Sequence, residues 1–147
     1  MPMRLHTQMP SLEGATDWIN SKPNSSALVN SLVLVYFWAL SCHVCHENFP
    51  KLQNWCNTYG PKGLKVLLIH CPRMKTDVNF KKVKATLASF NIKEPCGIDN
   101  LHKIKQAFNN EVWPAFYLFD RDGKLKRRTA GRAGYSMLKP LLEQLFE

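Results

Sequence analysis

Hydrophobic residues in this chain fall into two nearly continuous runs and several amphipathic stretches. The first run, residues 32–39, is rich in β-branched and aromatic residues, and the second covers residues 64–69. Short runs of this kind are typical of strands that are buried on both faces of a sheet. Neither run approaches the roughly 20 apolar residues that a membrane-spanning helix requires.

The amphipathic stretches predict helices, because apolar residues recur in them at every third or fourth position. Pro50 falls inside the first predicted helix and should bend it, since its nitrogen cannot donate to the preceding turn. Pro140 is tolerable only near the start of the last one. The predicted helices span residues 41–59, 77–90, 100–109 and 137–146.

Two short segments, the apolar 115–119 and the more polar 125–129, flank a polar turn that ends in Gly123. Gly123 can adopt a positive φ, so this pattern predicts a β-hairpin. Helices alternate with the first strands, which is typical of an α/β sheet. No repeat, low-complexity tract or linker interrupts the chain, so we expect a single domain over residues 1–147.

The chain of 147 residues is basic, with 20 Lys and Arg against 11 Asp and Glu, a net charge of +9. Its composition, 45% hydrophobic and 21% charged, excludes a disordered, collagen-like or coiled-coil protein. The basic residues concentrate at 73–84 and 121–132, and these stretches lack interleaved aromatic platforms. We expect solvated surfaces there, with docking to acidic partners as the alternative and no nucleic-acid binding.

The first residues lack the apolar segment of a secretory signal, and the five cysteines form an odd, uneven set. Secreted scaffolds normally carry an even and denser disulfide framework. We therefore expect a cytoplasmic monomer with no membrane association. A disulfide framework does not account for the two closely spaced cysteines.

Cys42 and Cys45, separated by His43 and Val44, lie where the first buried strand gives way to a helix. Residues i and i+3 at a helix start are near enough to form a disulfide. Free N–H groups and the positive end of the helix dipole stabilise a thiolate on the first cysteine. We therefore expect Cys42 to be the nucleophile and the more deeply placed Cys45 to be the resolving thiol.

Three alternatives to a redox role stay open for this cysteine pair. With His46 the segment matches the CxxCH pattern of haem attachment, although the preceding strand leaves little room for a haem-wrapping helical fold. Zinc binding would need further ligands, which His70 and Cys71 could supply. The last alternative is two cysteines without chemistry.

The segments 33–50, 63–73 and 111–131 resemble the thioredoxin superfamily, and most closely its TlpA/ResA-like branch of thiol–disulfide oxidoreductases. Within that branch the chain is most similar to the small, signal-less cytosolic members of Bacillus-type bacteria. The resemblance implies a thioredoxin-like α/β fold, in which helices flank a central mixed β-sheet. A β-hairpin and a helix form the C-terminal part of this fold. It also implies disulfide-bearing protein substrates, a recycling reductant, and no metal or cofactor besides the Cys42–Cys45 disulfide.

The resemblance extends to Pro114, which occupies the position of the family's cis-proline facing the dithiol. A cis bond after Trp113 would leave the backbone groups of that residue free to pair with an extended substrate chain. An ordinary trans proline at the start of a strand is the alternative.

Three residues depart from the family pattern. Tyr36 stands where thioredoxin carries a buried Asp, Ser41 replaces the Trp before the first cysteine, and Arg73 stands where ResA-like proteins carry an acidic residue. The proton acceptor for Cys45 is therefore open between Tyr36, His70 and water.

Side chains around the pair should tune its chemistry, beginning with His43 and Val44 between the cysteines. A cationic His43 would stabilise the thiolate and raise the reduction potential, unless it is a solvated bystander. Trp38 should pack below the active-site loop and screen the dithiol, and His70 should make a structural hydrogen bond. His46 should point outward.

The sequence thus predicts a thiol–disulfide oxidoreductase that reduces partner proteins in a reducing cytosol. Its rivals are a peptide-binding module without turnover and a peroxide-reducing relative. Cys56 and Cys96 should be buried core residues. Cys71 is the candidate for a third redox-active thiol.

Overall fold

The two apolar runs of the sequence form neighbouring parallel strands at the centre of a six-stranded sheet. They are β2 (Val33–Trp38) and β3 (Lys65–His70) in the computed structural model, which describes residues 1–147. The other strands are β1 (Asp17–Ile19), β4 (Cys96–Ile98), β5 (Ala115–Phe119) and β6 (Leu125–Ala130). The strand order is β1-β4-β3-β2-β5-β6.

The sheet is mixed, as the sequence and its family resemblance led us to expect. β4 extends the parallel set beside β3, whereas β1, β5 and β6 run antiparallel to their neighbours. The β5–β6 connection is the predicted hairpin, and Gly123 adopts a φ of 78° at its tip. Residues of the N-terminal arm pair with this hairpin, because the Met9 N–H donates to the Gly123 carbonyl and the His6 N–H to that of Leu125.

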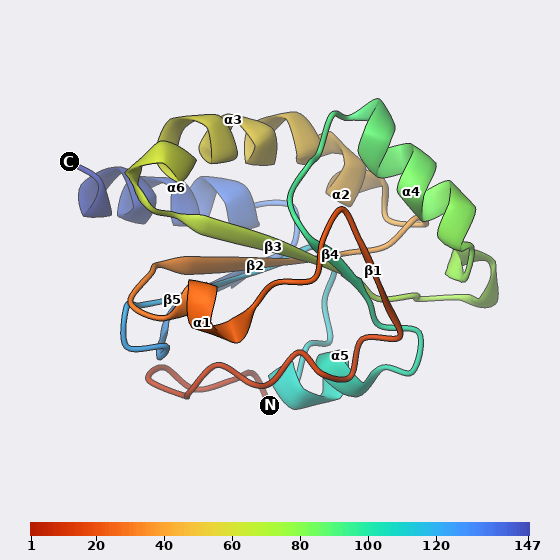
Figure 1. The fold of residues 1–147 in the computed structure, drawn as a ribbon, viewed down its shortest axis with the longest axis horizontal. Coiled ribbons are helices and arrows are strands. Elements are labelled where there is room, and N and C mark those ends of the chain that lie inside the picture. The colour runs from red at the N-terminus through yellow and green to blue at the C-terminus, as the bar shows by residue number, and fades with distance from the viewer.

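Alternate side chains of β2 enter two separate hydrophobic layers, because successive residues of a strand point to opposite faces. Leu34, Tyr36 and Trp38 belong to one layer, and the intervening residues of β2 belong to the other. Figure 1 shows the helices that cover the two faces. The first face carries α2 (His43–Glu47), α3 (Phe49–Tyr59), α4 (Phe80–Ser89) and α6 (Gly134–Leu145), and the second carries α1 (Ser25–Leu28) and α5 (Lys103–Phe108).

The single bent helix predicted over residues 41–59 is two helices, which corrects that expectation. The break falls at Asn48, which closes α2 and precedes α3. Pro50 therefore lies in the first turn of α3, where its missing N–H leaves no hydrogen bond unmade. A 3₁₀ turn, η1 (Gly60–Lys62), follows α3 directly.

The helix predicted over residues 77–90 begins later, at Phe80. Asn79 caps α4 by accepting a hydrogen bond from the Lys82 N–H, and Asp77 ends a separate 3₁₀ turn, η2 (Lys75–Asp77). The fifth helix is likewise shorter than expected, because the Asp99 carboxylate accepts from the backbone of Ile104 and so fixes its first turn. Side chains that hydrogen-bond the free N–H groups of the first turn therefore determine where α4 and α5 begin. The pattern of apolar residues does not show these hydrogen bonds.

The last helix differs from prediction at its N-terminus. α6 starts at Gly134, so Pro140 lies well inside it and not near its start. Pro140 is on the exposed face of the helix, where water can hydrate the carbonyl that the proline leaves unpaired. None of the helices has both the length and the apolar character needed to cross a membrane.

Candidate active site

Cys42 and Cys45 form a disulfide at the point where β2 gives way to α2. Cys42 is the N-cap of α2 and Cys45 lies in its first turn, which places their Cα atoms 5.3 Å apart. The sulfur of Cys42 also accepts a hydrogen bond of 3.2 Å from the Cys45 N–H. A thiolate at this position would receive the same hydrogen bond and the positive end of the helix dipole.

The two sulfurs differ in their access to solvent. Cys42 is 4% exposed, whereas Cys45 is fully buried in the hydrophobic layer that also holds Trp38 and Phe49. A large partner can therefore approach Cys42 alone.

Ser41, immediately before Cys42, is held by residues of the loop that follows β3. Its N–H donates to Asp77 Oδ1 at 2.9 Å and its hydroxyl donates to Asp77 Oδ2 at 2.8 Å. Arg73 Nε donates to the Ser41 hydroxyl oxygen at 3.1 Å, and Arg73 Nη2 donates to the Ser41 carbonyl at 2.7 Å. Every polar group of Ser41 therefore has a partner from this loop.

The Asp77 carboxylate is buried and stays charged. Burial alone would raise the pKa of Asp77, but hydrogen bonds from the N–H groups of Arg73, Met74 and Ser41 and from the Ser41 hydroxyl bring it below its usual value. Sequence analysis did not single out Asp77. Its position just beyond the end of a strand that neighbours β2 is the signal that could have identified it.

Two histidines hold Leu40, the residue before Ser41. The Leu40 N–H donates to His70 Nε2 at 3.1 Å, so this nitrogen is an acceptor and carries no hydrogen. His46 Nε2 lies 3.0 Å from the Leu40 carbonyl and must donate to it, because a carbonyl only accepts. The expectation that His46 points outward is wrong, since its ring packs against those of Trp38 and Phe49.

His70 is a neutral residue in this position. It is fully buried against the Trp38 ring, with ring centroids 4.8 Å apart. Burial lowers the pKa of His70 to about 4, and the nearby Asp77 charge does not compensate for it. The Leu40 N–H already occupies the lone pair of His70 that could accept a proton.

Tyr36 lies beneath the active-site helix. Its hydroxyl donates to the Cys45 carbonyl at 2.9 Å, and burial raises the pKa of Tyr36 well above its usual value. The hydroxyl thus anchors the backbone of the resolving cysteine and keeps its own proton. Trp38, the next inward residue of β2, is fully buried beside the disulfide in the same layer.

His43 and Val44, between the two cysteines, lie in different environments. The His43 side chain is 85% exposed, and its Nε2 lies 3.3 Å from Glu47 Oε1 one helical turn along. Such an exposed pair contributes little to stability. Val44 is half-buried and packs against the layer that contains the disulfide.

Trp113 and Pro114 lie just before β5, and the peptide bond between them is cis. Trp113 packs against both hydrophobic layers, including the one that contains Cys42 and Cys45. Its backbone N–H and carbonyl make no hydrogen bond within the chain. By contrast, the backbone carbonyl of Pro114 accepts a hydrogen bond of 2.9 Å from the Gly131 N–H.

The other three cysteines are protected thiols. Burial raises the pKa of Cys56 and of Cys71 well above the usual value, with contributions from Glu94 and Asp99 respectively. Burial also raises the pKa of Cys96, to about 12. All three therefore stay protonated at neutral pH and are poor nucleophiles.

The ligand cluster that zinc binding would require is not assembled. No group of three or more His, Cys, Asp or Glu side chains converges in a metal-holding arrangement. His70, which the zinc alternative needs, has its Nε2 engaged by the Leu40 N–H.

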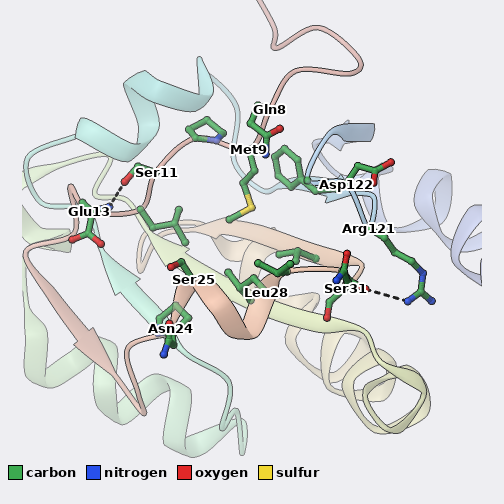
Figure 2. A pocket seen from close by; sticks show the side chains of 18 of the residues that line it. Gln8, Met9, Ser11, Glu13, Asn24, Ser25, Leu28, Ser31, Arg121 and Asp122 are labelled. Atoms are coloured by element: carbon green, nitrogen blue, oxygen red, sulfur yellow. Dashed lines mark hydrogen bonds between the residues drawn. The ribbon is translucent and has the colours of Figure 1, made fainter.

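A wide pocket lies away from the disulfide, at the opposite end of β2. It has a volume of about 790 Å³ and is lined by the N-terminal arm, α1 and the hairpin turn. Figure 2 shows Met9 on the arm and Leu28 on α1 at opposite sides of this space, with Asp122 of the hairpin turn at its rim. The pocket contains neither cysteine of the pair, so the dithiol chemistry takes place elsewhere.

Comparison with known proteins gives the same assignment along most of the chain. Residues 5–128 match the AhpC/TSA family. The chain is 36% identical over 138 residues to the thiol-disulfide oxidoreductase YkuV of Bacillus subtilis (strain 168), covering 93% of each protein. It is 25% identical over 130 residues to ResA of Bacillus thuringiensis (strain Al Hakam), covering 88% of this chain and 72% of ResA.

A solved structure agrees with these sequence matches. The solution structure of a thioredoxin-like protein in its oxidized form superposes with a TM-score of 0.89 and 34% sequence identity, over 98% of this chain and 97% of that one. The family match covers strands β1 to β5, most of β6, the active-site helix and the disulfide described above. The chain therefore belongs to the AhpC/TSA family of thioredoxin-like proteins, among its thiol–disulfide oxidoreductases.

Proposed function

We propose that this thiol–disulfide oxidoreductase reduces protein disulfides, with Cys42 as the nucleophile and Cys45 as the resolving thiol. The observation that supports these roles most directly is the asymmetry of the disulfide, in which Cys42 keeps a small exposure of 4% and Cys45 is fully buried. The nucleophile must reach a sulfur of another protein, whereas the resolving thiol needs only to reach its neighbour.

In the proposed reaction the Cys42 thiolate attacks one sulfur of a substrate disulfide. A bond forms between Cys42 and that sulfur, and the other substrate sulfur leaves as a thiolate. Cys45, once deprotonated, attacks Cys42 and releases the second substrate thiol. Two electrons pass from the dithiol to the substrate, and the Cys42–Cys45 disulfide remains.

Water is the proposed proton acceptor for Cys45. The Tyr36 hydroxyl is committed to the Cys45 carbonyl, and the His70 acceptor nitrogen is committed to the Leu40 N–H. Neither side chain therefore offers a free base to the buried thiol. His43 is proposed to tune Cys42 only weakly, because its partner Glu47 offsets any positive charge.

Substrates are proposed to be extended protein segments that carry a disulfide. The unpaired backbone groups of Trp113 can hydrogen-bond such a segment beside the dithiol, as an added strand would. We propose that the protein works as a monomer in a reducing compartment, the cytoplasm. There a recycling reductant restores the dithiol after each cycle.

Variants of the two active-site cysteines test this proposal in an assay of protein-disulfide reduction. We expect Cys42→Ser to lose catalysis, because no nucleophile remains. Cys45→Ser should accumulate a mixed disulfide with the substrate through Cys42, identified by peptide mass. Cys56→Ser is the matched control and should keep the wild-type rate.

Two results would contradict the proposal. One is a Cys42→Ser protein that still reduces disulfides, and the other is a Cys45→Ser adduct on a different cysteine. A peptide-binding module would bind substrate equally well after both cysteines were changed to serine. A peroxide-reducing enzyme would consume hydrogen peroxide at a rate comparable with disulfide reduction.

A further inference from the structure

Ser41 is fixed to the loop after β3 by a group of hydrogen bonds that we call the Ser41 clasp, made of Ser41, Arg73 and Asp77. Asp77 accepts from the N–H and hydroxyl of Ser41, and Arg73 donates to the hydroxyl and the carbonyl. The clasp joins segments that lie far apart along the chain, since the Ser41–Arg73 separation is 32 residues. It therefore fixes the residue that precedes the nucleophile.

We propose that Arg73 and Asp77 are positioning residues for disulfide exchange, which act on Cys42 through Ser41. In this arrangement Arg73 also supplies a positive charge that favours the thiolate form of Cys42. The inference rests on the proposed function, because it assumes that Cys42 is the attacking sulfur.

The position of the Arg73 guanidinium carries the electrostatic part of the proposal. Its Nη2 is 2.7 Å from the Ser41 carbonyl oxygen, which belongs to the peptide group that joins Ser41 to Cys42. The positive charge is therefore one peptide group from the nucleophile. A cation this near lowers the free energy of a thiolate, and the exposure of Arg73 to solvent reduces the effect without abolishing it.

The negative charge of Asp77 is placed differently. Its carboxylate accepts four hydrogen bonds, from the Ser41 N–H and hydroxyl and from the N–H groups of Arg73 and Met74. These donors stabilise the carboxylate in a buried position. Asp77 thus fixes the conformation of the loop after β3, whereas Arg73 supplies the positive charge beside the Ser41–Cys42 peptide group.

The remaining titratable and charged groups around the loop are engaged in other contacts. His70 is neutral, and His46 donates to the Leu40 carbonyl. Glu47 lies between two side chains, with His43 Nε2 at 3.3 Å and Arg132 Nη1 at 3.4 Å. Arg73 is therefore the cation that contacts the backbone of the Ser41–Cys42 link.

The proposal fixes the direction of the redox effect. Oxidation of the pair releases two electrons and converts the Cys42 thiolate and the Cys45 thiol into a disulfide, with loss of the Cys45 proton. A group that stabilises the thiolate stabilises the reduced protein. Removing the Arg73 charge should therefore favour the disulfide form.

The test compares Arg73→Gln, Arg73→Lys and Asp77→Asn with the control Arg127→Gln, which removes an exposed arginine of β6. Two quantities are measured for each reduced protein. They are the pH profile of Cys42 alkylation by iodoacetamide, mapped by peptide mass, and the equilibrium with glutathione buffers.

We expect Arg73→Gln to raise the midpoint of the alkylation profile by about 0.5 to 1 pH unit, as for loss of a nearby cation. It should also shift the glutathione equilibrium toward the disulfide by about three- to tenfold, where tenfold corresponds to about 30 mV. Arg73→Lys should retain most of the wild-type midpoint because it keeps the charge. Asp77→Asn removes a negative charge and should move the midpoint the opposite way.

Simple loosening of the loop would move the midpoints of Arg73→Gln and Asp77→Asn in the same direction, and that result would overturn the proposal. So would an Arg73→Gln protein that matches wild type and Arg127→Gln in both measurements. If Asp77→Asn does not fold, the comparison of the Gln and Lys variants at position 73 decides alone. Failure of the wild-type protein to form the two-electron couple would instead overturn the proposed function.

Discussion

At the scale of single residues, the active site depends on how the loop before Cys42 is held. The backbone of Leu40 is bound by two histidines, and Ser41 is bound by Arg73 and Asp77. These hydrogen bonds hold Leu40 and Ser41 in place, so the backbone before Cys42 has little freedom to move. Exchange chemistry can then proceed without a separate step that orders the nucleophile.

The burial of His70 makes the stability of the protein depend on pH. The pKa of His70 is about 4 in the folded protein, below the ordinary value near 6.5 that it regains on unfolding. Its contribution to the free energy of unfolding is therefore complete above about pH 6.5 and is lost as the pH falls toward 4. The total loss should be about 3 kcal/mol.

Urea unfolding at several pH values between 4 and 7 measures this contribution. We expect His70→Asn to remove most of the decline between pH 6.5 and 4, because the unfolded state no longer takes up that proton. His102→Asn is the matched control, because it makes the same substitution at a partly buried histidine elsewhere in the fold. Equal slopes in His70→Asn and wild type would contradict the assignment of His70 as a buried neutral acceptor.

The cysteine pair could be predicted from the sequence because strand, motif and helix are contiguous there. The partners of Ser41 could not, because Asp77 lies 36 residues away and the connection depends on how two loops meet. The prediction for His46 failed for a related reason. Its side chain turns back along α2 toward the Leu40 carbonyl, and helical periodicity does not show this contact.

At the scale of helices and strands, apolar periodicity identified the elements and local caps decided their ends. Asn79 delays the start of α4, and the break at Asn48 divides the predicted first helix into α2 and α3. The active-site helix α2 is therefore short, because it ends at Asn48. Sequence periodicity cannot show such a break, because the apolar positions continue across it.

The packing of α6 against the sheet gives a test at this scale. Leu138 is fully buried in the layer that holds the disulfide, whereas its neighbour Met137 is 58% exposed. We expect Leu138→Ala to lower the free energy of unfolding by about 2 to 4 kcal/mol, through lost burial and a cavity. Met137→Ala is the control, with an expected change below about 1 kcal/mol.

Denaturant unfolding of the two variants decides whether α6 is packed as described. Similar losses of stability in both proteins would show that the helix is rotated relative to the sheet or only loosely attached to it. The comparison is sensitive because the two residues are adjacent, so changes in helix propensity are similar and burial is the main difference.

At the scale of the whole molecule, the fold separates the dithiol from the wide pocket. The parallel strands β2 and β3 both end where the active-site loop meets the loop that carries Arg73 and Asp77. Ligand and catalytic sites in open α/β sheets commonly form at this edge. The wide pocket under the N-terminal arm lies at the other end of β2 (Figure 2), remote from the dithiol.

The mixed sheet and its helical layers were accessible from the sequence through the two apolar runs, the hairpin signal and the family resemblance. The pairing of the N-terminal arm with the hairpin was not, because residues 6–9 carry no strand-like pattern. That contact depends on the free edge of the hairpin, which β6 presents as the outermost strand of the sheet.

A redox titration of the wild-type protein in glutathione buffers, with alkylation and peptide mass mapping, measures whether Cys42 and Cys45 act as one redox couple. We expect Cys42 and Cys45 to convert together as a two-electron couple, with a potential nearer to about −270 mV, the value of a reductant such as thioredoxin, than to about −120 mV. Cys71 and Cys96 should remain thiols throughout, since both are fully buried. Independent labelling of Cys42 and Cys45, or a potential near about −120 mV, would contradict the account of this protein as a dithiol reductase.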